Sequence, residues 1–131
     1  MGKYGRASLL ALERIQESSV VDPVAAWKSA VAQVFPNSQS SQEKGCPKGA
    51  FLGLCSDGLV KGVEPGNYTR SKDNKKYAVK AVDLLKQDPS LSERPNDLWN
   101  EILDGEEKVE NSQTDVVIAL WNSGAIETAH V

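Results

Sequence analysis

The sequence predicts an all-α fold of about six helices in one domain. Apolar residues recur at helical spacing in six segments, and most of these segments begin or end with residues typical of helix caps. Only one short stretch, residues 58–63, has a strand-like pattern. The length of 131 residues fits a single domain, and 40% apolar with 25% charged residues is ordinary for a globular protein. We therefore expect one helical domain over residues 1–131.

Three helices are expected in the amino-terminal half. The first covers residues 4–17, where apolar side chains recur along one face. The second begins with Asp22 as N-cap and Pro23 at the first helical position, a combination that favours a helix start. The third covers residues 47–58, and we expect Cys46 at its N-cap.

Three more helices are expected in the carboxyl-terminal half. Ser71 caps the fourth, which ends at Asp88 before a proline. Asn96 opens the short fifth helix. Ser112 opens the sixth, and Asp115 lies three residues later, so the two resemble a capping box.

Similar segments in the two halves predict an internal duplication. "NSQ" occurs at 37–39 and again at 111–113. "FLGLCSDGLV" at 51–60 matches "VIALWNSGAI" at 117–126 in its apolar pattern, with Gly124 at a left-handed C-cap position. A pseudo-twofold pair of three-helix units would explain this pattern. The predicted halves are about 4–60 and 77–126, joined by a junction at 61–76.

Several residues are expected to pack in the interior. Trp27, Trp99 and Trp121 lie on apolar helix faces, which predicts that all three are in the core. Gly49 and Gly53 are four residues apart, so they share one face of the third helix. Each glycine in a helix costs about 1 kcal/mol relative to alanine, which indicates either close packing of another helix or a ligand against bare backbone.

The first half contains an insertion, residues 40–49 ("SSQEKGCPKG"), that the second half lacks. Loops added to a scaffold often carry function, so we expect ligand contacts from this insertion and from the junction residues 66–76. In the junction, Arg70 and neighbouring hydroxyl groups precede a helix start, a setting that favours an anion. The candidate ligand-binding residues are Lys44, Cys46, Lys48, Tyr68, Thr69, Arg70, Ser71 and Lys72.

Cys46 is a weak candidate for a catalytic nucleophile. A helix start and the nearby Lys44 and Lys48 would stabilise a thiolate, but nucleophilic catalysis also needs a base. The only histidine, His130, is next to the carboxyl end, so a simple helix-start role for Cys46 is the alternative. With Cys55 nine residues away and no CxxC spacing, we expect neither a disulfide nor a metal site.

Charge is divided unevenly along the chain, whose net charge is −3. Residues 44–80 carry eight basic and three acidic side chains, whereas residues 81–131 carry three basic and eleven acidic ones. A basic region of this kind could attract an anionic ligand, a protein partner or nucleic acid. The overall acidity and the lack of a recognition-helix pattern argue against nucleic acid.

Four stretches, "PNS", "KGCPKGAFLGLC", "GNYTRS" and "YAVKAV", resemble a family of small uncharacterised bacterial proteins, a domain of unknown function. The resemblance covers nearly the whole chain and implies a bacterial source but no known activity.

These observations predict a small cytoplasmic binding or regulatory module with a basic central region. The alternative is a binder of nucleic acid or a phosphate anion that uses residues 44–80, and a cysteine enzyme using Cys46 comes third. We expect no cofactor and no membrane span, since no apolar run approaches the length that a bilayer requires. The oligomeric state stays open, and a homodimer is compatible with a pseudo-twofold chain.

Overall fold

The computed structural model describes residues 2–17 and 22–127. Six helices of nine or more residues, one four-residue helix and one 3-10 helix account for the regular structure of this part of the chain. The predicted all-α fold is confirmed, and the short α3 falls where the insertion begins. The elements are α1 (Lys3–Gln16), α2 (Pro23–Val34), α3 (Gln39–Gln42), α4 (Gly45–Ser56), α5 (Lys72–Gln87), η1 (Pro89–Glu93), α6 (Pro95–Leu103) and α7 (Gln113–Asn122).

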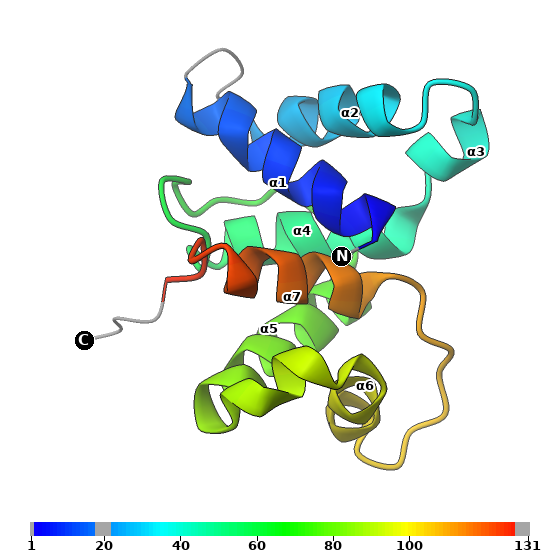
Figure 1. The fold of residues 1–131 in the computed structure, drawn as a ribbon. Coiled ribbons are helices and arrows are strands. Elements are labelled where there is room, and N and C mark those ends of the chain that lie inside the picture. Colours follow the sequence, from blue (N-terminus) through cyan, green and yellow to red (C-terminus); the bar gives the residue numbers. More distant parts are fainter. Residues whose placement is uncertain (1, 18–21, 128–131) are drawn as a thin grey trace.

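The helices form three layers, with α1 and α2 on one side, α4 and α7 in the middle and α5 and α6 on the other side (Figure 1). Buried apolar residues from all six longer helices make one continuous core. The largest fully buried side chains include Trp27, Phe51, Leu85, Leu98 and Leu120. A single core explains why the chain folds as one unit.

The central position of α4 follows from its sequence. Nine of its twelve residues are buried, whereas α1 and α5 each bury one face and expose charged residues on the other. A helix that is apolar nearly all round is stable only when other helices surround it.

Glycines in α4 allow α5 to approach closely. A Cβ atom on Gly53 would lie 2.7 Å from the Cα atom of Lys75, and one on Gly49 would lie 2.8 Å from the Cβ atom of Asn74. Carbon atoms prefer separations of about 3.5–4.0 Å, so these positions accept only glycine without movement. Close helix packing therefore compensates for the two glycines.

Helices α4 and α7 end in the same way. Gly58 and Gly124 have φ angles of +72° and +78°, and the residue after each glycine donates its N–H to the carbonyl four residues before that glycine. The following residues, Val60 and Ile126, form an isolated antiparallel bridge. The left-handed C-cap predicted at Gly124 is confirmed, and the strand-like stretch 58–63 makes only this bridge. The duplication itself stays a prediction.

The predicted capping box at the start of α7 is wrong. Ser112 takes the N-cap position, but its side chain makes no capping hydrogen bond. The Asp115 carboxylate instead accepts the N–H groups of Gly2 at 2.8 Å and Gly5 at 2.7 Å. This carboxylate caps α1, because the unpaired N–H groups at a helix start attract a negative charge.

Two other details differ from expectation. Helix α6 begins at Pro95, one residue before the predicted Asn96. Trp27 and Trp99 are buried as predicted, but Trp121 is only partly buried. No helix in residues 2–17 and 22–127 has both the length and the apolar character needed to cross a bilayer.

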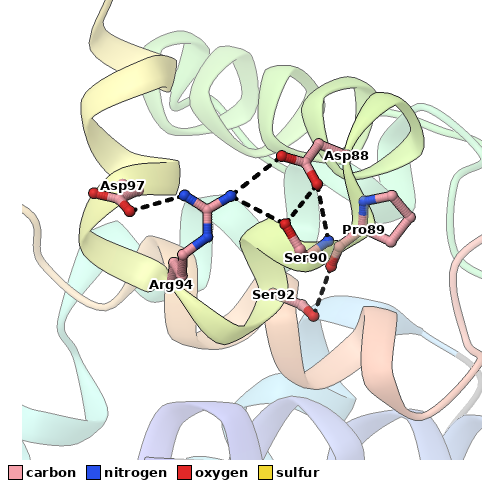
Figure 2. Close-up of polar contacts among 6 residues, drawn as sticks. All are labelled: Asp88, Pro89, Ser90, Ser92, Arg94 and Asp97. Carbon is pink, nitrogen blue, oxygen red and sulfur yellow. Dashed lines mark hydrogen bonds and ion pairs between the residues drawn. The ribbon is translucent and has the colours of Figure 1, made fainter.

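A polar cluster holds the connection between α5 and α6 (Figure 2). The Arg94 guanidinium lies between Asp88 and Asp97, with N–O distances of 3.2 and 2.9 Å, and it also donates to the Ser90 hydroxyl. Ser90 donates both its N–H and its hydroxyl to Asp88, and these hydrogen bonds are the main reason that the pKa of the Asp88 carboxyl is lowered. The cluster fixes the sharp turn at η1.

Candidate ligand-binding site

A cavity of about 420 Å³ lies between α2, α3 and the start of α4. Its walls combine apolar side chains of α2 with charged and amide side chains, several of which come from the insertion 40–49. This mixture is typical of small-molecule sites, which occupy about 300–1,000 Å³. The lining residues are Val24, Trp27, Lys28, Val31, Gln39, Gln42, Glu43 and Lys48.

The first residues of the insertion belong to the short helix α3, which forms one wall of this cavity. Side-chain hydrogen bonds hold this helix in place. Ser38 is the N-cap of α3 and accepts the N–H of Ser41 at 3.3 Å. The Gln42 side chain donates to the Phe35 carbonyl at 2.7 Å, which ties α3 to the end of α2. The cavity wall is therefore held by hydrogen bonds on both sides of the turn.

Trp27 contributes a buried hydrogen-bond donor that has no acceptor. The residue is 1% exposed, and its ring stacks on Phe51 with centroids 5.2 Å apart. Its indole nitrogen has no hydrogen-bond partner among the described residues, whereas that of Trp99 donates to the Lys108 carbonyl at 3.0 Å. A buried donor without a partner costs about 1–3 kcal/mol, so such a group calls for an explanation.

Charged groups around the cavity give it a net positive charge. Lys28 and Lys48 are exposed, and neither has an ion-pair partner in the described part of the chain. Glu43 accepts a hydrogen bond from Gln39 at 2.7 Å. With two ammonium groups and one carboxylate, the formal charge of the lining is +1.

A larger groove, of about 600 Å³, runs along α7 between α1 and the η1–α6 connection. Most of its polar groups already have partners: Asp115 caps α1, Thr114 donates its hydroxyl to Glu110, and Ser123 donates to the Leu120 carbonyl. The cavity between α2, α3 and α4 thus offers a ligand more unpaired polar groups than the larger groove.

The three candidates from the insertion point to different places. The Lys44 ammonium lies 5.3 Å from the centroid of the Tyr4 ring. The Cys46 sulfur is 3.7 Å from the side-chain nitrogen of Asn111, on another face of the molecule. Of the three, only Lys48 lines the cavity.

The prediction that Cys46 is the N-cap of α4 is wrong. The helix begins at Gly45, and Lys44 takes the N-cap position. Proline is tolerated in the first turn of a helix, so Pro47 does not mark its first residue. Cys46 is half-buried and shares a shallow depression with Glu106.

Cys55 is fully buried in the core, and this burial raises the pKa of its thiol to about 12. Both cysteines are free. The described residues hold no cluster of three or more histidine, cysteine or acidic side chains that could bind a metal. His130 lies outside the described residues.

The junction candidates are engaged largely in local structure. The Tyr68 hydroxyl donates to a backbone carbonyl at 2.6 Å, Thr69 accepts the N–H of Ser71, and the Ser71 hydroxyl accepts from an asparagine side chain. Arg70 is exposed, and Lys72 lines a separate open depression along α5. Lys72 and Lys48 therefore line different concavities.

Two of the lysine side chains of α5 already have partners within the protein. The Lys75 ammonium is 2.7 Å from Asp57, and the Lys80 ammonium donates to the Ile102 carbonyl at 2.7 Å. These contacts leave fewer ammonium groups on α5 available to bind phosphate groups.

Comparison with known families supports the resemblance noted from the sequence. A family model described as "Family of unknown function (DUF6979)" matches residues 1–127. The chain belongs to this family. No curated protein and no solved structure matches it. Membership of DUF6979 implies no activity, because the function of the family is unknown.

Sequence reasoning missed the five lining residues that lie outside the insertion, Val24, Trp27, Lys28, Val31 and Gln39. One signal was available, since Trp27 and Lys28 lie on the helix just before the insertion. The unpaired state of the indole N–H had no sequence signal, because it depends on which acceptors the folded chain brings near it.

Proposed function

We propose that this DUF6979 protein is a small-molecule-binding module whose site is the cavity between α2, α3 and α4. The observation that carries the proposal is a cavity of about 420 Å³ whose lining includes Lys28 and Lys48, two charged side chains without an ion-pair partner in the described part of the chain. An acceptor group of a bound molecule would give these ammonium groups a partner, and a charge-assisted hydrogen bond of this kind is stronger than one between neutral groups.

Binding fits the cavity better than catalysis does. Its lining supplies ammonium groups, amides and an apolar wall, but it contains no nucleophile next to a base. The free thiols of Cys46 and Cys55 fit a reducing compartment, and we place the module in the cytoplasm.

Nuclear magnetic resonance of the indole N–H groups tests the proposal. A set of acidic, basic and neutral fragments is added to the ¹⁵N-labelled protein, and the Trp27→Phe variant assigns the Trp27 signal. We expect some fragments to shift this signal and leave the Trp99 signal unchanged. A Val24→Trp variant, which places an indole at the half-buried rim, should abolish the shift. Fragments that perturb only residues of the α7 groove would refute the proposed site.

A second candidate function, anion or nucleic-acid binding along α5, is supported by one observation. Arg70, Lys72 and Lys76 are exposed and have no ion-pair partner in residues 2–17 and 22–127. Binding of an oligonucleotide that weakens steeply with salt, and that is lost in Lys72→Met with Lys76→Met, would support it. Binding that is insensitive to both changes would exclude it.

A further inference from the structure

We propose that Asp104 is a site of spontaneous covalent modification, at which the backbone isomerises through a succinimide to a β-aspartyl linkage. The proposal concerns the connection between α6 and α7 and does not depend on the cavity between α2, α3 and α4. It is carried by a comparison of the two Asp-Gly pairs of the sequence, Asp57-Gly58 at the end of α4 and Asp104-Gly105 at the end of α6. The two pairs differ in what holds them in place.

The reaction needs only the aspartate, the next amide nitrogen and water. The Gly105 nitrogen attacks the side-chain carboxyl carbon of Asp104, a C–N bond forms, and the carboxyl hydroxyl leaves with the amide proton as water. Water then opens the five-membered ring at either carbonyl, and opening at the former main-chain carbonyl leaves the chain linked through the side chain of Asp104. Glycine favours the attack, because it has no Cβ atom to hinder its nitrogen and its backbone turns freely.

The Asp104-Gly105 pair is free to make this movement. Both residues are exposed, and among the residues that the structure describes the Asp104 carboxylate has no partner and the Gly105 N–H has no acceptor. Asp104 has φ +48° and ψ +50°, a left-handed conformation that residues with a side chain rarely adopt. Ring closure requires rotation about ψ of Asp104, and this rotation gives up one backbone hydrogen bond, from Glu106 to the Leu103 carbonyl at 3.0 Å.

The Asp57-Gly58 pair is held from both sides. The Asp57 carboxylate lies 2.7 Å from the Lys75 ammonium nitrogen. The Gly58 N–H donates to the Cys55 carbonyl at 3.2 Å, within the C-cap that leads to the bridge between the ends of α4 and α7. The same rotation at Asp57 must break these contacts first, so the fold protects this pair as it protects any group that reacts only after local opening.

Isomerisation at Asp104 changes the backbone where the chain leaves α6. A β-aspartyl linkage adds one carbon to the main chain and turns the former main-chain carboxyl into a side group. Two contacts of this connection lie just beyond: the Tyr77 hydroxyl donates to Glu106 at 3.0 Å, and the Trp99 indole donates to the Lys108 carbonyl at 3.0 Å. We expect the modified form to lose both contacts in part, which would shift the Trp99 indole N–H signal.

Oxygen labelling measures the reaction. The folded protein is incubated at neutral pH in H₂¹⁸O, digested in ordinary water, and the two Asp-Gly peptides are compared by mass spectrometry. Each passage through the succinimide adds one labelled oxygen from water. We expect labelling at Asp104 to be at least about tenfold faster than at Asp57 in the folded protein, because only Asp57 must wait for local opening. In urea, where neither pair is held, the two rates should be similar.

Two variants test the chemistry at the same position. Asp104→Glu keeps the charge but would have to close a larger ring, so its labelling should fall to background. Asp104→Asn also accepts the left-handed conformation, and it should react faster with release of ammonia, because a neutral amide is a better electrophile than a carboxylate. Circular dichroism of both variants checks that the fold is kept.

Three results would overturn the proposal. The first is labelling at Asp104 that is no faster than at Asp57 in the folded protein. The second is a difference between the two pairs that persists unchanged in urea, since neighbouring residues and not the fold would then set the rates. The third is labelling of Asp104→Glu that equals labelling of Asp104, since a succinimide would then not be the route.

Discussion

The closeness of α4 to α5 makes a sharp prediction for Gly53→Ala. The added Cβ atom would lie 2.7 Å from both the Cα and the Cβ atoms of Lys75. Carbon atoms pack at about 3.5–4.0 Å, and a backbone Cα atom cannot rotate away, so the two helices must separate by about 1 Å. Overpacking of this kind costs about 1–3 kcal/mol, and alanine recovers about 1 kcal/mol through its helix propensity.

Because the obstructing atom is backbone, we expect the cost to fall near the upper end, which leaves a net loss of about 1–2 kcal/mol. Urea unfolding followed by far-ultraviolet circular dichroism measures this loss, and the thermal midpoint should fall by roughly 3–10 °C. Gly45→Ala is the matched control in the same helix, since nothing lies within 4 Å of its added Cβ atom. If Gly53→Ala is as stable as Gly45→Ala, the α4–α5 contact is looser than described and the packing argument fails.

Three further predictions concern other parts of the fold. Asp115→Ala should lower the free energy of unfolding by about 1–2 kcal/mol, because two N–H groups of α1 lose their acceptor. Asp115→Asn should lower it less, and equal losses for the two variants would contradict the capping role. Stability should decline as the pH rises from about 9 towards 12, because the Cys55 thiol ionises near 9 when unfolded but has a pKa of about 12 when folded. Cys55→Ala should show a shallower decline in urea titrations over that range, and an unchanged slope would refute this assignment. Arg94→Ala should cost no more than about 1 kcal/mol, because its ion pairs are exposed, and a larger loss in urea unfolding would show that the η1 cluster is more important.

The sequence predicts a helix end correctly where the capping residue is adjacent to the helix in the chain. Asp22 caps α2 as predicted, and its carboxylate accepts the N–H of Val24 at 3.1 Å. The capping box at Asp115 is not formed, because the start of α1, more than 100 residues away in sequence, takes this carboxylate. No local pattern reveals a competitor brought by the fold.

The candidate site was predictable only in part, and helix geometry explains the main error. Cys46 and Lys48 are two residues apart, which is about 200° around a helix of 3.6 residues per turn. They therefore face nearly opposite directions on α4, and only Lys48 reaches the cavity. This separation follows from the spacing alone once the helix is known to begin at Gly45. Lys48 lies near Lys28 and Trp27 because of how α2 and α3 pack against α4. The spacing of residues along the sequence does not predict this packing.

A crystal structure of the protein with a fragment bound tests the proposed site most directly. We predict that the fragment lies in the cavity between α2, α3 and α4, with its polar group within about 3 Å of an ammonium nitrogen of Lys28 or Lys48. Fragments bound only in the groove along α7 would contradict the account.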